Sequence, residues 1–383
     1  MDFTFSAEQE ELIRTLRGFA RRELAPHSLE WDGTREFPWA TWRQMGELGL
    51  FGLRVASQYG GQEADLLTTG LAIQEIARGD FSCTGGMQLA LLAAEILGRE
   101  GSDAVKNQWL PPMVRGEAII SLALTEPGVG SDAARLVCRA ERDGDDYVIT
   151  GEKSGITFGM VSQAVVVFAR TGAAAGARGI TAFLVPFDRP DVSRSPIRDL
   201  GCRLMQRAVL AFDHVRIPAS HRIGKEGAGF YQVMRGFDYN RLMIALACLG
   251  VAEISLEETM AYVRERQAFG RPLAQFEGIS FPIAEAATQL EAAKWFCYRG
   301  LSLADRDQPY TKESAMAKWW VPKISVEVIH QCLLFHGHYG YTEELPFEQR
   351  LRDVLGFEIG DGTAEVSKIV AARELLGRES RPY

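Results

Sequence analysis

The residues best suited to contact a flat ligand lie in a polar turn at positions 124–132. The turn reads Leu124-Thr125-Glu126-Pro127-Gly128-Val129-Gly130-Ser131-Asp132 and follows an apolar run. Glycine lets a backbone approach a planar or phosphorylated ligand closely, and hydroxyl and backbone N–H groups supply neutral hydrogen-bond donors. The segment therefore predicts a ligand-contacting turn. Taken alone, it specifies no particular ligand.

A second group of residues able to do chemistry lies toward the C-terminus. Asp361 stands between Gly360 and Gly362, just before an apolar run with helical spacing. A carboxylate in this position can act as a general base, or the Asp-Gly pair can simply form a turn that caps the helix. Asp238 and Arg241 are three residues apart, so they form either a surface ion pair on a helix or part of a binding site.

Length and composition are those of an ordinary globular protein with two or three packed cores, since 46% of the 383 residues are hydrophobic and 24% are charged. The 50 acidic residues outnumber the 42 basic ones, giving a net charge of −8. This balance argues against a nucleic-acid partner. The N-terminus has no basic segment followed by an apolar run, and no uninterrupted apolar stretch reaches about 18 residues. We therefore expect a cytoplasmic protein without a membrane span.

The spacing of cysteine and histidine predicts neither a disulfide framework nor a metal site. The six cysteines are scattered without a CxxC pair, which is typical of reduced thiols in a core. His336 and His338 are two residues apart, so they would not share a helix face. No carboxylate nearby has the spacing that would complete a set of metal ligands.

Hydrophobic periodicity divides the chain into three parts, at residues 1–117, 118–227 and 228–383. In the first and last parts, apolar residues recur every three or four positions, which predicts helices. In the middle part, short strand-like runs alternate with glycine, aspartate and proline, which predicts a small, mostly antiparallel β domain. The fold class is therefore α+β. No GxGxxG motif follows a strand, so a Rossmann dinucleotide site is not expected.

Individual elements can be placed within these parts. Strands are expected at 119–124, 147–150, 165–169, 180–186 and 209–215, with a hairpin turn at Asp143-Gly144. Helices in the last part are expected around 243–251, 281–303, 315–334 and 365–376. Ser6 is the expected N-cap of the first helix, with Gln9 as its capping-box partner.

A series of motifs, in order along about 310 residues, resembles the acyl-CoA dehydrogenase family. The matching segments are Glu47-Leu48-Gly49-Leu50, Tyr59-Gly60-Gly61, Thr125 to Asp132, Gly151-Glu152-Lys153 with Ile156-Thr157, Asp238 with Arg241, Arg266 to Gly270, His336-Gly337, Tyr339 to Thr342, Arg352-Asp353 and Asp361-Gly362-Thr363. Each match is weak alone, but the ordered series is specific. The resemblance implies an N-terminal helical domain, a central antiparallel β-barrel-like domain and a C-terminal four-helix bundle.

The resemblance also implies a cofactor, partners and site residues. It implies FAD at a subunit interface, an acyl-CoA substrate, electron-transferring flavoprotein as acceptor, and a homotetramer built as a dimer of dimers. The implied FAD contacts are Leu124, Thr125, Gly130, Ser131, Ile156 and Thr157 near the isoalloxazine, Arg266 and Phe269 near the pyrophosphate and adenine across the subunit boundary, and Thr363 and Glu365. The implied CoA and thioester contacts are Ser131, Asp238, Arg241 and Gly362. Asp361 matches the catalytic base, which removes the α-proton while a hydride passes from Cβ to flavin N5.

The sequence departs from the family around that base. The base is normally glutamate, whereas the side chain of Asp361 reaches about 1.5 Å less. Some relatives place the base just before the arginine that matches Arg241, where this chain has Asn240, which cannot act as a carboxylate base. Gly155 and Gly360 replace a tryptophan and an aromatic residue. These changes predict a wider pocket for an alicyclic or α-branched acyl group, with cyclohexane-1-carboxyl-CoA giving cyclohex-1-ene-1-carboxyl-CoA as the specific hypothesis.

Three other functions stay open on the sequence. An acyl-carrier-protein dehydrogenase of secondary metabolism would share the fold and chemistry, and it would need a basic docking face. A flavin monooxygenase on this fold typically lacks a base at both positions, so Asp361 argues against it. A non-catalytic acyl-CoA-binding relative would keep the fold without turnover, which Asp361 and the intact turn at 124–132 disfavour.

Overall fold

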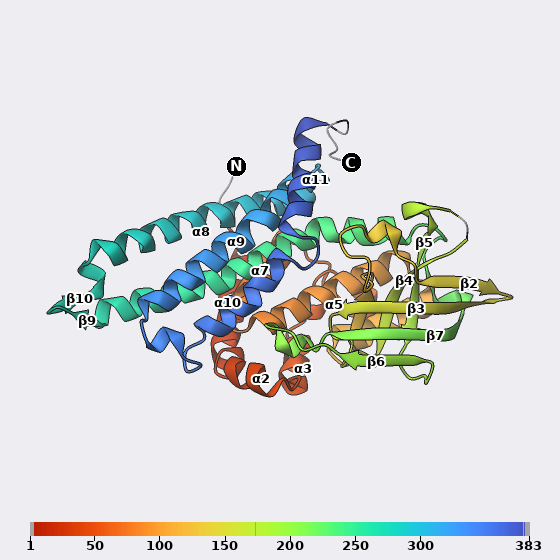
Figure 1. The fold of residues 1–383 in the computed structure, drawn as a ribbon, viewed down its shortest axis with the longest axis horizontal. Coiled ribbons are helices and arrows are strands. Elements are labelled where there is room, and N and C mark those ends of the chain that lie inside the picture. Colours follow the sequence, from red (N-terminus) through yellow and green to blue (C-terminus); the bar gives the residue numbers. More distant parts are fainter. Residues whose placement is uncertain (1–3, 173, 378, 380–383) are drawn as a thin grey trace.

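The computed structural model describes residues 4–172, 174–377 and 379. Helices from both ends of the chain pack together, and a sheet formed by the middle of the chain lies at one end of the molecule (Figure 1). This order confirms the predicted α+β architecture of helical, β and helical parts. The domain limits at 117/118 and 227/228 stay predictions.

The first part contains six α-helices. They are α1 (Ala7–Phe19), α2 (Ser28–Thr34), α3 (Trp39–Glu47), α4 (Leu66–Ala77), α5 (Phe81–Glu100) and α6 (Asp103–Val114), with one π-helical turn at Ala20–Leu24. The capping box predicted for the first helix is confirmed, because Ser6 Oγ accepts the N–H of Gln9 at 3.2 Å and Gln9 Oε1 accepts the N–H of Ser6 at 3.1 Å. Two orphan donors of the first turn are thereby satisfied.

The middle part forms an eight-stranded sheet. Its strands are β1 (Ile120–Ala123), β2 (Arg139–Asp143), β3 (Asp146–Ile156), β4 (Ala164–Arg170), β5 (Ile180–Pro186), β6 (Val192–Pro196), β7 (Ala208–Pro218) and β8 (Arg222–Ile223). The order is β6-β7-β3-β2-β4-β5-β8, with β1 paired to β4. The sheet is mostly antiparallel as predicted, and β2 and β3 form the predicted hairpin, with its turn at Gly144-Asp145, one residue beyond the predicted Asp143-Gly144. The β1–β4 pair is parallel.

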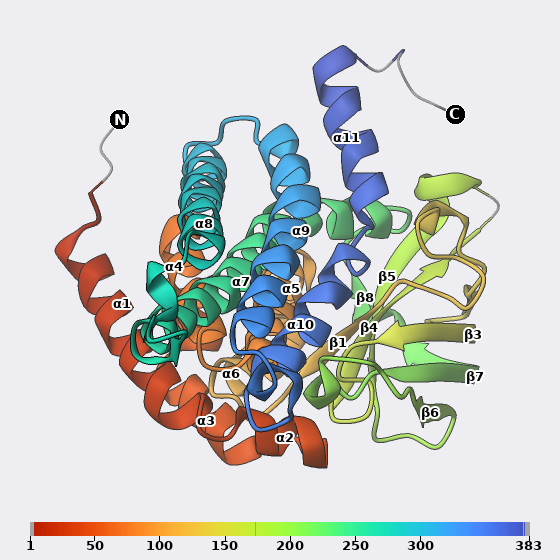
Figure 2. The same ribbon diagram turned by 60° about the vertical axis from the view of Figure 1, so that its left-hand side comes forward.

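In its described residues, the last part contains five α-helices and a small hairpin. The elements are α7 (Gly229–Glu265), β9 (Gln267–Ala268), β10 (Arg271–Pro272), α8 (Glu277–Ala304), α9 (Thr311–Phe335), α10 (Phe347–Leu355) and α11 (Ala364–Leu376). Helices α7, α8 and α9 pack against one another, and α11 packs on α9 and projects from the body (Figures 1 and 2). Sequence periodicity missed α10, because nine residues give too few turns for a clear pattern.

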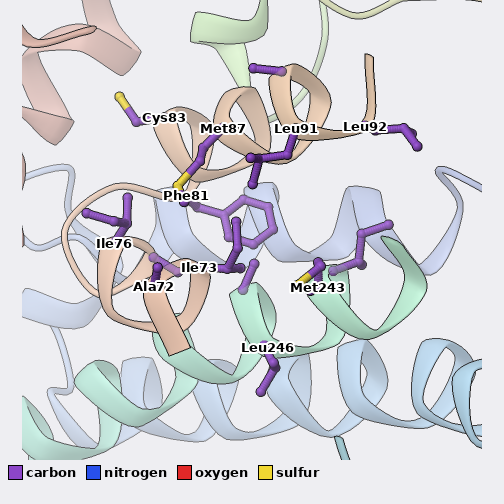
Figure 3. Close-up of a cluster of buried hydrophobic side chains, with 14 of the residues drawn as sticks. Ala72, Ile73, Ile76, Phe81, Cys83, Met87, Leu91, Leu92, Met243 and Leu246 are labelled. Atoms are coloured by element: carbon purple, nitrogen blue, oxygen red, sulfur yellow. The ribbon is translucent and has the colours of Figure 1, made fainter. Parts of the chain in front are cut away.

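The main core lies where α4, α5 and α7 meet. Ile73, Phe81, Leu91 and Leu246 from these helices are almost fully buried and lie close together (Figure 3). Among the described residues, α5 is the single helix long and apolar enough to cross a membrane, and 83% of its apolar stretch is buried inside the protein. A core helix passes the same test.

The cysteines and histidines take structural positions. All six cysteines are free and buried. His336 is buried, stacks on Tyr262 with ring centroids 4.2 Å apart, and its Nδ1 lies 2.9 Å from the carbonyl oxygen of Cys332. Within the described ranges, no group of three or more His, Cys, Asp or Glu side chains is placed to hold a metal ion.

Candidate active site

A buried ion pair holds the polar turn at 124–132 against the sheet. Lys153 on β3 is fully buried, and its Nζ lies 2.8 Å from Glu126 Oε1 and 3.0 Å from the carbonyl oxygen of Leu124. The Glu126 carboxylate also accepts the N–H groups of Val137 at 2.7 Å and Cys138 at 2.9 Å. Burial lowers the pKa of Lys153, and the negative charge of Glu126 opposes that shift. The pair therefore fixes the start of the turn, at Leu124 and Glu126, and joins it to residues 137–138.

The same region brings two predicted flavin contacts together. The N–H of Ser154 donates to the carbonyl of Thr125 at 3.0 Å, which joins the turn to β3. Ser121 on β1 donates to the carbonyl of Thr157 at 2.8 Å. Leu124 and Ile156 are buried beneath this junction, whereas Thr125 is exposed and Thr157 is half-buried. Two hydroxyl groups and an apolar floor thus share one face of the β domain.

This face fits a flavin ring. Gly130 and Ser131 are exposed beside Thr125, and a Cβ atom added at Gly130 or Gly155 would meet no atom within 4 Å. The backbone at Gly155 has φ +71°, a conformation that strains other residues. The backbone conformation thus favours glycine there, and the position leaves open space. Neutral donors next to open space are what an uncharged planar ligand requires.

Asp361 lies in a turn that a buried lysine holds from below. Lys318 on α9 is fully buried, and its Nζ donates to the carbonyl oxygens of Phe357 at 2.6 Å and Gly362 at 3.0 Å. Burial lowers the pKa of Lys318 to about 8, while the negative charge of Asp361 opposes the shift. Asp361 itself has φ +54°. This left-handed conformation costs free energy for a non-glycine residue, so the surrounding contacts must hold the turn in place.

The Asp361 carboxylate is accessible and sits among positive charges. Its side chain is exposed, and Oδ2 accepts a hydrogen bond from Asn240 Nδ2 at 3.3 Å. The protein packed around the turn raises the pKa of Asp361, and the charges of Lys318, Arg241 and Arg207 and the Asn240 hydrogen bond partly offset that rise. A carboxylate with a raised pKa is a better proton acceptor than an ordinary one. Asn240, the alternative base position considered in the sequence, therefore donates a hydrogen bond to the carboxylate of Asp361.

Asp238 and Arg241 form an ion pair on α7 in which Arg241 is buried and Asp238 is half-buried, so the interpretation as an exposed surface pair is wrong. Arg241 is 7% exposed, and its Nη1 lies 2.9 Å from Asp238 Oδ1. The second oxygen of Asp238 accepts a hydrogen bond from Thr311 at 3.0 Å. Burial lowers the pKa of Arg241 and raises that of Asp238. Arg241 Nε has no hydrogen-bond partner among the described residues, which leaves a charged donor for a ligand.

Of the remaining predicted cofactor residues, Thr363 directly follows the Asp361-Gly362 turn, whereas Arg266 and Phe269 lie away from it within one chain. Arg266 and Phe269 lie at the β9–β10 hairpin, at the opposite end of the molecule from the sheet (Figure 1). Phe269 is 96% exposed. Thr363 caps α11, since its Oγ1 accepts the N–H of Val366 at 3.2 Å. Glu365 is exposed in the first turn, where a backbone N–H lowers its pKa.

Sequence reasoning assigned no role to several residues that shape the site. Lys318 falls on the apolar stripe of its helix with Ser314, Val321 and Ser325, all of them buried. A lone lysine in such a stripe is a signal for a buried charge with specific partners. Asn240 was considered only as a missing base, and the pairing of Glu126 with Lys153 had no signal in their spacing of 27 residues.

Hydroxyl groups beside open space on the β domain, in a chain that also holds an accessible carboxylate, suit a flavin-dependent oxidoreductase. Residues 6–117, 121–215 and 227–376 match the N-terminal, middle and C-terminal domains of acyl-CoA dehydrogenase. The chain is 38% identical over 373 residues to the mitochondrial short-chain specific acyl-CoA dehydrogenase of Bos taurus, covering 96% of this chain and 90% of the relative.

Two solved structures are closely similar. Butyryl-CoA dehydrogenase from Megasphaera elsdenii aligns with a TM-score of 0.94 and 31% identity over 98% of this chain and 100% of that chain. The prolyl acyl carrier protein oxidase AnaB aligns with a TM-score of 0.93 and 29% identity over 97% of this chain and 100% of that chain. The chain belongs to the acyl-CoA dehydrogenase family, whose members are FAD-dependent oxidoreductases acting on CH–CH bonds.

Proposed function

We propose that this protein removes hydrogen across Cα–Cβ of a compact acyl-CoA, with Asp361 as the base. The observation that carries this proposal is an exposed carboxylate whose turn is held by Lys318 and which accepts a hydrogen bond from Asn240. Bound FAD would supply the hydride acceptor. The chain's own part is to orient the thioester, hold Asp361 against Cα and accept the α-proton on its carboxylate.

Thr125, Gly130, Ser131 and Thr157 would hold the isoalloxazine, with Leu124 and Ile156 beneath it. Their shared face and the open space above the glycines support this assignment. Ser131, Gly362 and the ion pair of Asp238 with Arg241 would line the CoA and thioester channel, supported by the unpartnered Arg241 Nε.

Arg266 and Phe269 of a second subunit would contact the pyrophosphate and adenine, together with Thr363 and Glu365. The exposure of Phe269, and the position of the β9–β10 hairpin at the end of the molecule opposite the sheet, support a site shared between subunits. A homotetramer is typical of the family, and electron-transferring flavoprotein is the proposed acceptor.

The proposed acyl group is a ring, with cyclohexane-1-carboxyl-CoA as the specific candidate. The names of the short-chain and butyryl-CoA relatives support a small acyl group. Asp361 is shorter than the usual glutamate, and Gly155 leaves open space where relatives carry a large ring. A pocket that is short but wide suits a substrate whose Cα is already part of a ring.

The test is anaerobic bleaching of the flavin band with a panel of thioesters. Cyclohexane-carboxyl-CoA, butyryl-CoA and octanoyl-CoA would be mixed with the native protein and with Asp361→Ala. We expect rapid bleaching by the cyclic thioester, slower bleaching by the straight chains, and loss of bleaching in the variant. Fast bleaching by butyryl-CoA beside slow bleaching by the ring would refute the substrate. Retention of fast bleaching in the variant would refute the base.

One observation favours an acyl carrier protein as the thiol. A cavity of about 600 Å³ on the β domain is lined by Arg139, Arg142 and Arg170, with Glu141 and Glu226 also present. The excess is one positive charge, which is small for a docking face, so CoA stays the first choice. Arg139→Ala would raise KM for a carrier-bound acyl group and leave KM for the CoA thioester unchanged if the carrier is the substrate. If Arg139→Ala changes KM equally for the carrier-bound and the CoA thioester, this cavity has no role in recognising the carrier.

A further inference from the structure

The side chain of Asn240 on α7 is buried beside the proposed base, with 4% of the residue exposed. Its Nδ2 lies 3.3 Å from Asp361 Oδ2, whereas its Oδ1 has no hydrogen-bond partner among the residues that the structure describes. Native proteins rarely leave a buried polar atom unpaired, because burial without a hydrogen bond costs stability. The observed orientation of the amide therefore uses one half of the hydrogen-bonding capacity of Asn240.

Within the described ranges, no second hydrogen bond holds this amide in one orientation. Gln74 on α4 shows the opposite case, because its Nε2 donates to Glu253 at 2.8 Å and its Oε1 accepts from the Tyr298 hydroxyl at 2.5 Å. Those partners fix the orientation of Gln74. Rotation about the Cβ–Cγ bond of asparagine is broad and roughly two-fold. A half-turn of Asn240 would place Oδ1 where Nδ2 lies, 3.3 Å from Asp361 Oδ2.

The other groups that act on the Asp361 carboxylate are positively charged and contain donors without acceptors. They are Lys318 on α9, Arg241 on α7 and Arg207 just before β7. These side chains also donate to acceptors elsewhere, which are the carbonyls of Phe357 and Gly362, Asp238 Oδ1 and Asp199 Oδ2. On the turn itself, Glu358 adds a negative charge near Lys318. These surroundings suit a carboxylate better than a carboxylic acid.

In the proposed reaction, Asp361 changes from a carboxylate to a carboxylic acid. The Cα–H bond breaks, its proton forms an O–H bond on Asp361, and its electron pair enters the new Cα=Cβ bond while the Cβ hydride leaves to bound FAD. The new O–H group then needs an acceptor, because an unmade hydrogen bond in a site covered by substrate is costly. Of the four groups around Asp361, Asn240 alone contains an acceptor atom.

We propose that Asn240 is a positioning residue that serves both states of the base. Its Nδ2 donates to the carboxylate and, after a half-turn, its Oδ1 accepts from the carboxylic acid. This inference rests on the proposed function and adds a role at the same site. The acceptor role is the stronger of the two. The donated bond is long beside the ordinary range of about 2.7–3.2 Å, and without it the carboxylate would keep three cations nearby.

Asn240→Leu, which has nearly the same shape without polar atoms, separates the two roles by the direction of a shift. Losing the acceptor disfavours the acid and lowers the pKa of Asp361, whereas losing the donor alone raises it. Because activity requires the carboxylate, the pH of half-maximal flavin reduction should fall by about one unit, equivalent to about tenfold for one lost hydrogen bond. The measurement is anaerobic bleaching at saturating concentration of the thioester that bleaches fastest.

The extent of bleaching at equilibrium is a second readout. At about two pH units above the midpoint, it reports the balance between the substrate complex, with Asp361 ionised, and the product complex, with Asp361 protonated. Asn240→Leu should shift this balance about tenfold toward substrate. Asn240→Gln keeps an amide that can turn, so both readouts should stay closer to those of the native protein.

Tyr298→Phe is the control for a loss of stability alone. Tyr298 is buried on α8, and its hydroxyl donates to the amide of Gln74. This variant removes a buried hydrogen bond to an amide outside the site, so neither readout should move. FAD content and Tm, measured for every variant, identify those that fail to fold.

The direction of the pH shift decides between the possible roles. A shift of Asn240→Leu to higher pH would show a donor alone and would overturn the acceptor role. An unmoved pH profile and an unmoved equilibrium would reduce Asn240 to a structural residue. Asn240→Gln displaced as far as Asn240→Leu would overturn the role of the amide. Fast bleaching retained in Asp361→Ala would instead refute the proposed base, and this inference with it.

Discussion

Lys318 Nζ donates a hydrogen bond to the carbonyl oxygen of Gly362 at 3.0 Å, directly after the proposed base. A second hydrogen bond, to the carbonyl of Phe357 at 2.6 Å, lies before it. The two contacts bracket a turn in which Asp361 adopts φ +54°. A buried lysine thus holds an unfavourable backbone conformation and at the same time places a positive charge near the carboxylate.

Removing that lysine should weaken catalysis and shift its pH dependence. Lys318→Met deletes a charge that lowers the pKa of Asp361. Since Asp361 works as the carboxylate, activity rises as pH increases through its pKa, and the variant should need a higher pH to reach half of its maximum. The pH profile of kcat on the preferred thioester measures this. A lower kcat with an unmoved profile would mean that Lys318 supports the turn without affecting the charge of Asp361.

The same lysine predicts a pH dependence of stability. Its pKa in the folded protein is about 8, below the ordinary value of 10.5, so the unfolded chain binds more protons between these values. Stability therefore rises with pH across that window, by about 3 kcal/mol for a shift of this size. Urea unfolding of the native protein and Lys318→Met at pH 7.5 and pH 10 gives the difference. The native protein should gain relative to the variant, and a constant difference would contradict the shifted pKa.

Neutralising the proposed base should abolish turnover but not binding. Asp361→Asn keeps the size of the side chain and removes its ability to accept the α-proton, so kcat should fall by about 10²–10⁴-fold. Binding of a non-reactive thioester analogue, followed by the flavin spectrum, should stay within a few fold of the native protein. Asp361→Glu is the informative companion, since activity retained on straight chains would show that side-chain length selects the substrate.

Breaking the buried ion pair beneath the turn should destabilise the protein. Lys153→Met leaves the Glu126 carboxylate buried without its counter-charge, which costs about 3–5 kcal/mol. We also expect FAD to dissociate more readily, because Glu126 fixes the turn through Val137 and Cys138. The double variant Glu126→Gln with Lys153→Met should recover part of the stability. Unfolding midpoints and the flavin absorbance retained after gel filtration measure both effects. A double variant whose loss of stability equals the sum of the two single losses would contradict the pairing of Glu126 with Lys153.

Restoring an aromatic residue beside the base should narrow the pocket. A Cβ atom at Gly360 would lie 3.4 Å from the carbonyl oxygen of Gly356, and φ at Gly360 is not positive, so the backbone tolerates a side chain. Gly360→Tyr should lower kcat/KM for ring thioesters more than for butyryl-CoA. Gly360→Ala adds the Cβ alone and is the control for backbone effects. Equal losses on both substrates would argue against a pocket shaped by this position.

The fold was predictable where its signals are local. Ser6 and Gln9 predict the first helix because a capping box involves neighbouring residues. The Asp143-Gly144 pair predicts the β2–β3 hairpin to within one residue of its turn at Gly144-Asp145. The parallel pairing of β1 with β4 joins residues more than 40 positions apart, so no local pattern reports it. Strands β6 and β8 escaped prediction because one is largely exposed and the other has two residues.

The site was predictable as a set of positions but not as a set of contacts. The ordered motifs placed Asp361, Thr125 and Arg241 without any geometry. They could not show that Asn240 donates a hydrogen bond to Asp361, because the two residues are 121 positions apart in the sequence. Burial also decided between two interpretations of Asp238 and Arg241. Their spacing suits an exposed pair, and only the packing of α7 buries Arg241.

The 37-residue length of α7 sets the offset between two halves of the proposed shared site. Arg241 and Arg266 are 25 residues apart along this helix, or roughly 38 Å at about 1.5 Å per residue. Each residue also turns the helix by about 100°. Inserting one residue between them would therefore swing the β9–β10 hairpin a quarter turn away from its neighbour. Inserting seven would restore its direction but move it about 10 Å outward. We therefore expect assembly and cofactor retention to be lost more fully with one inserted residue, which changes the direction of the hairpin, than with seven, which mainly change its distance.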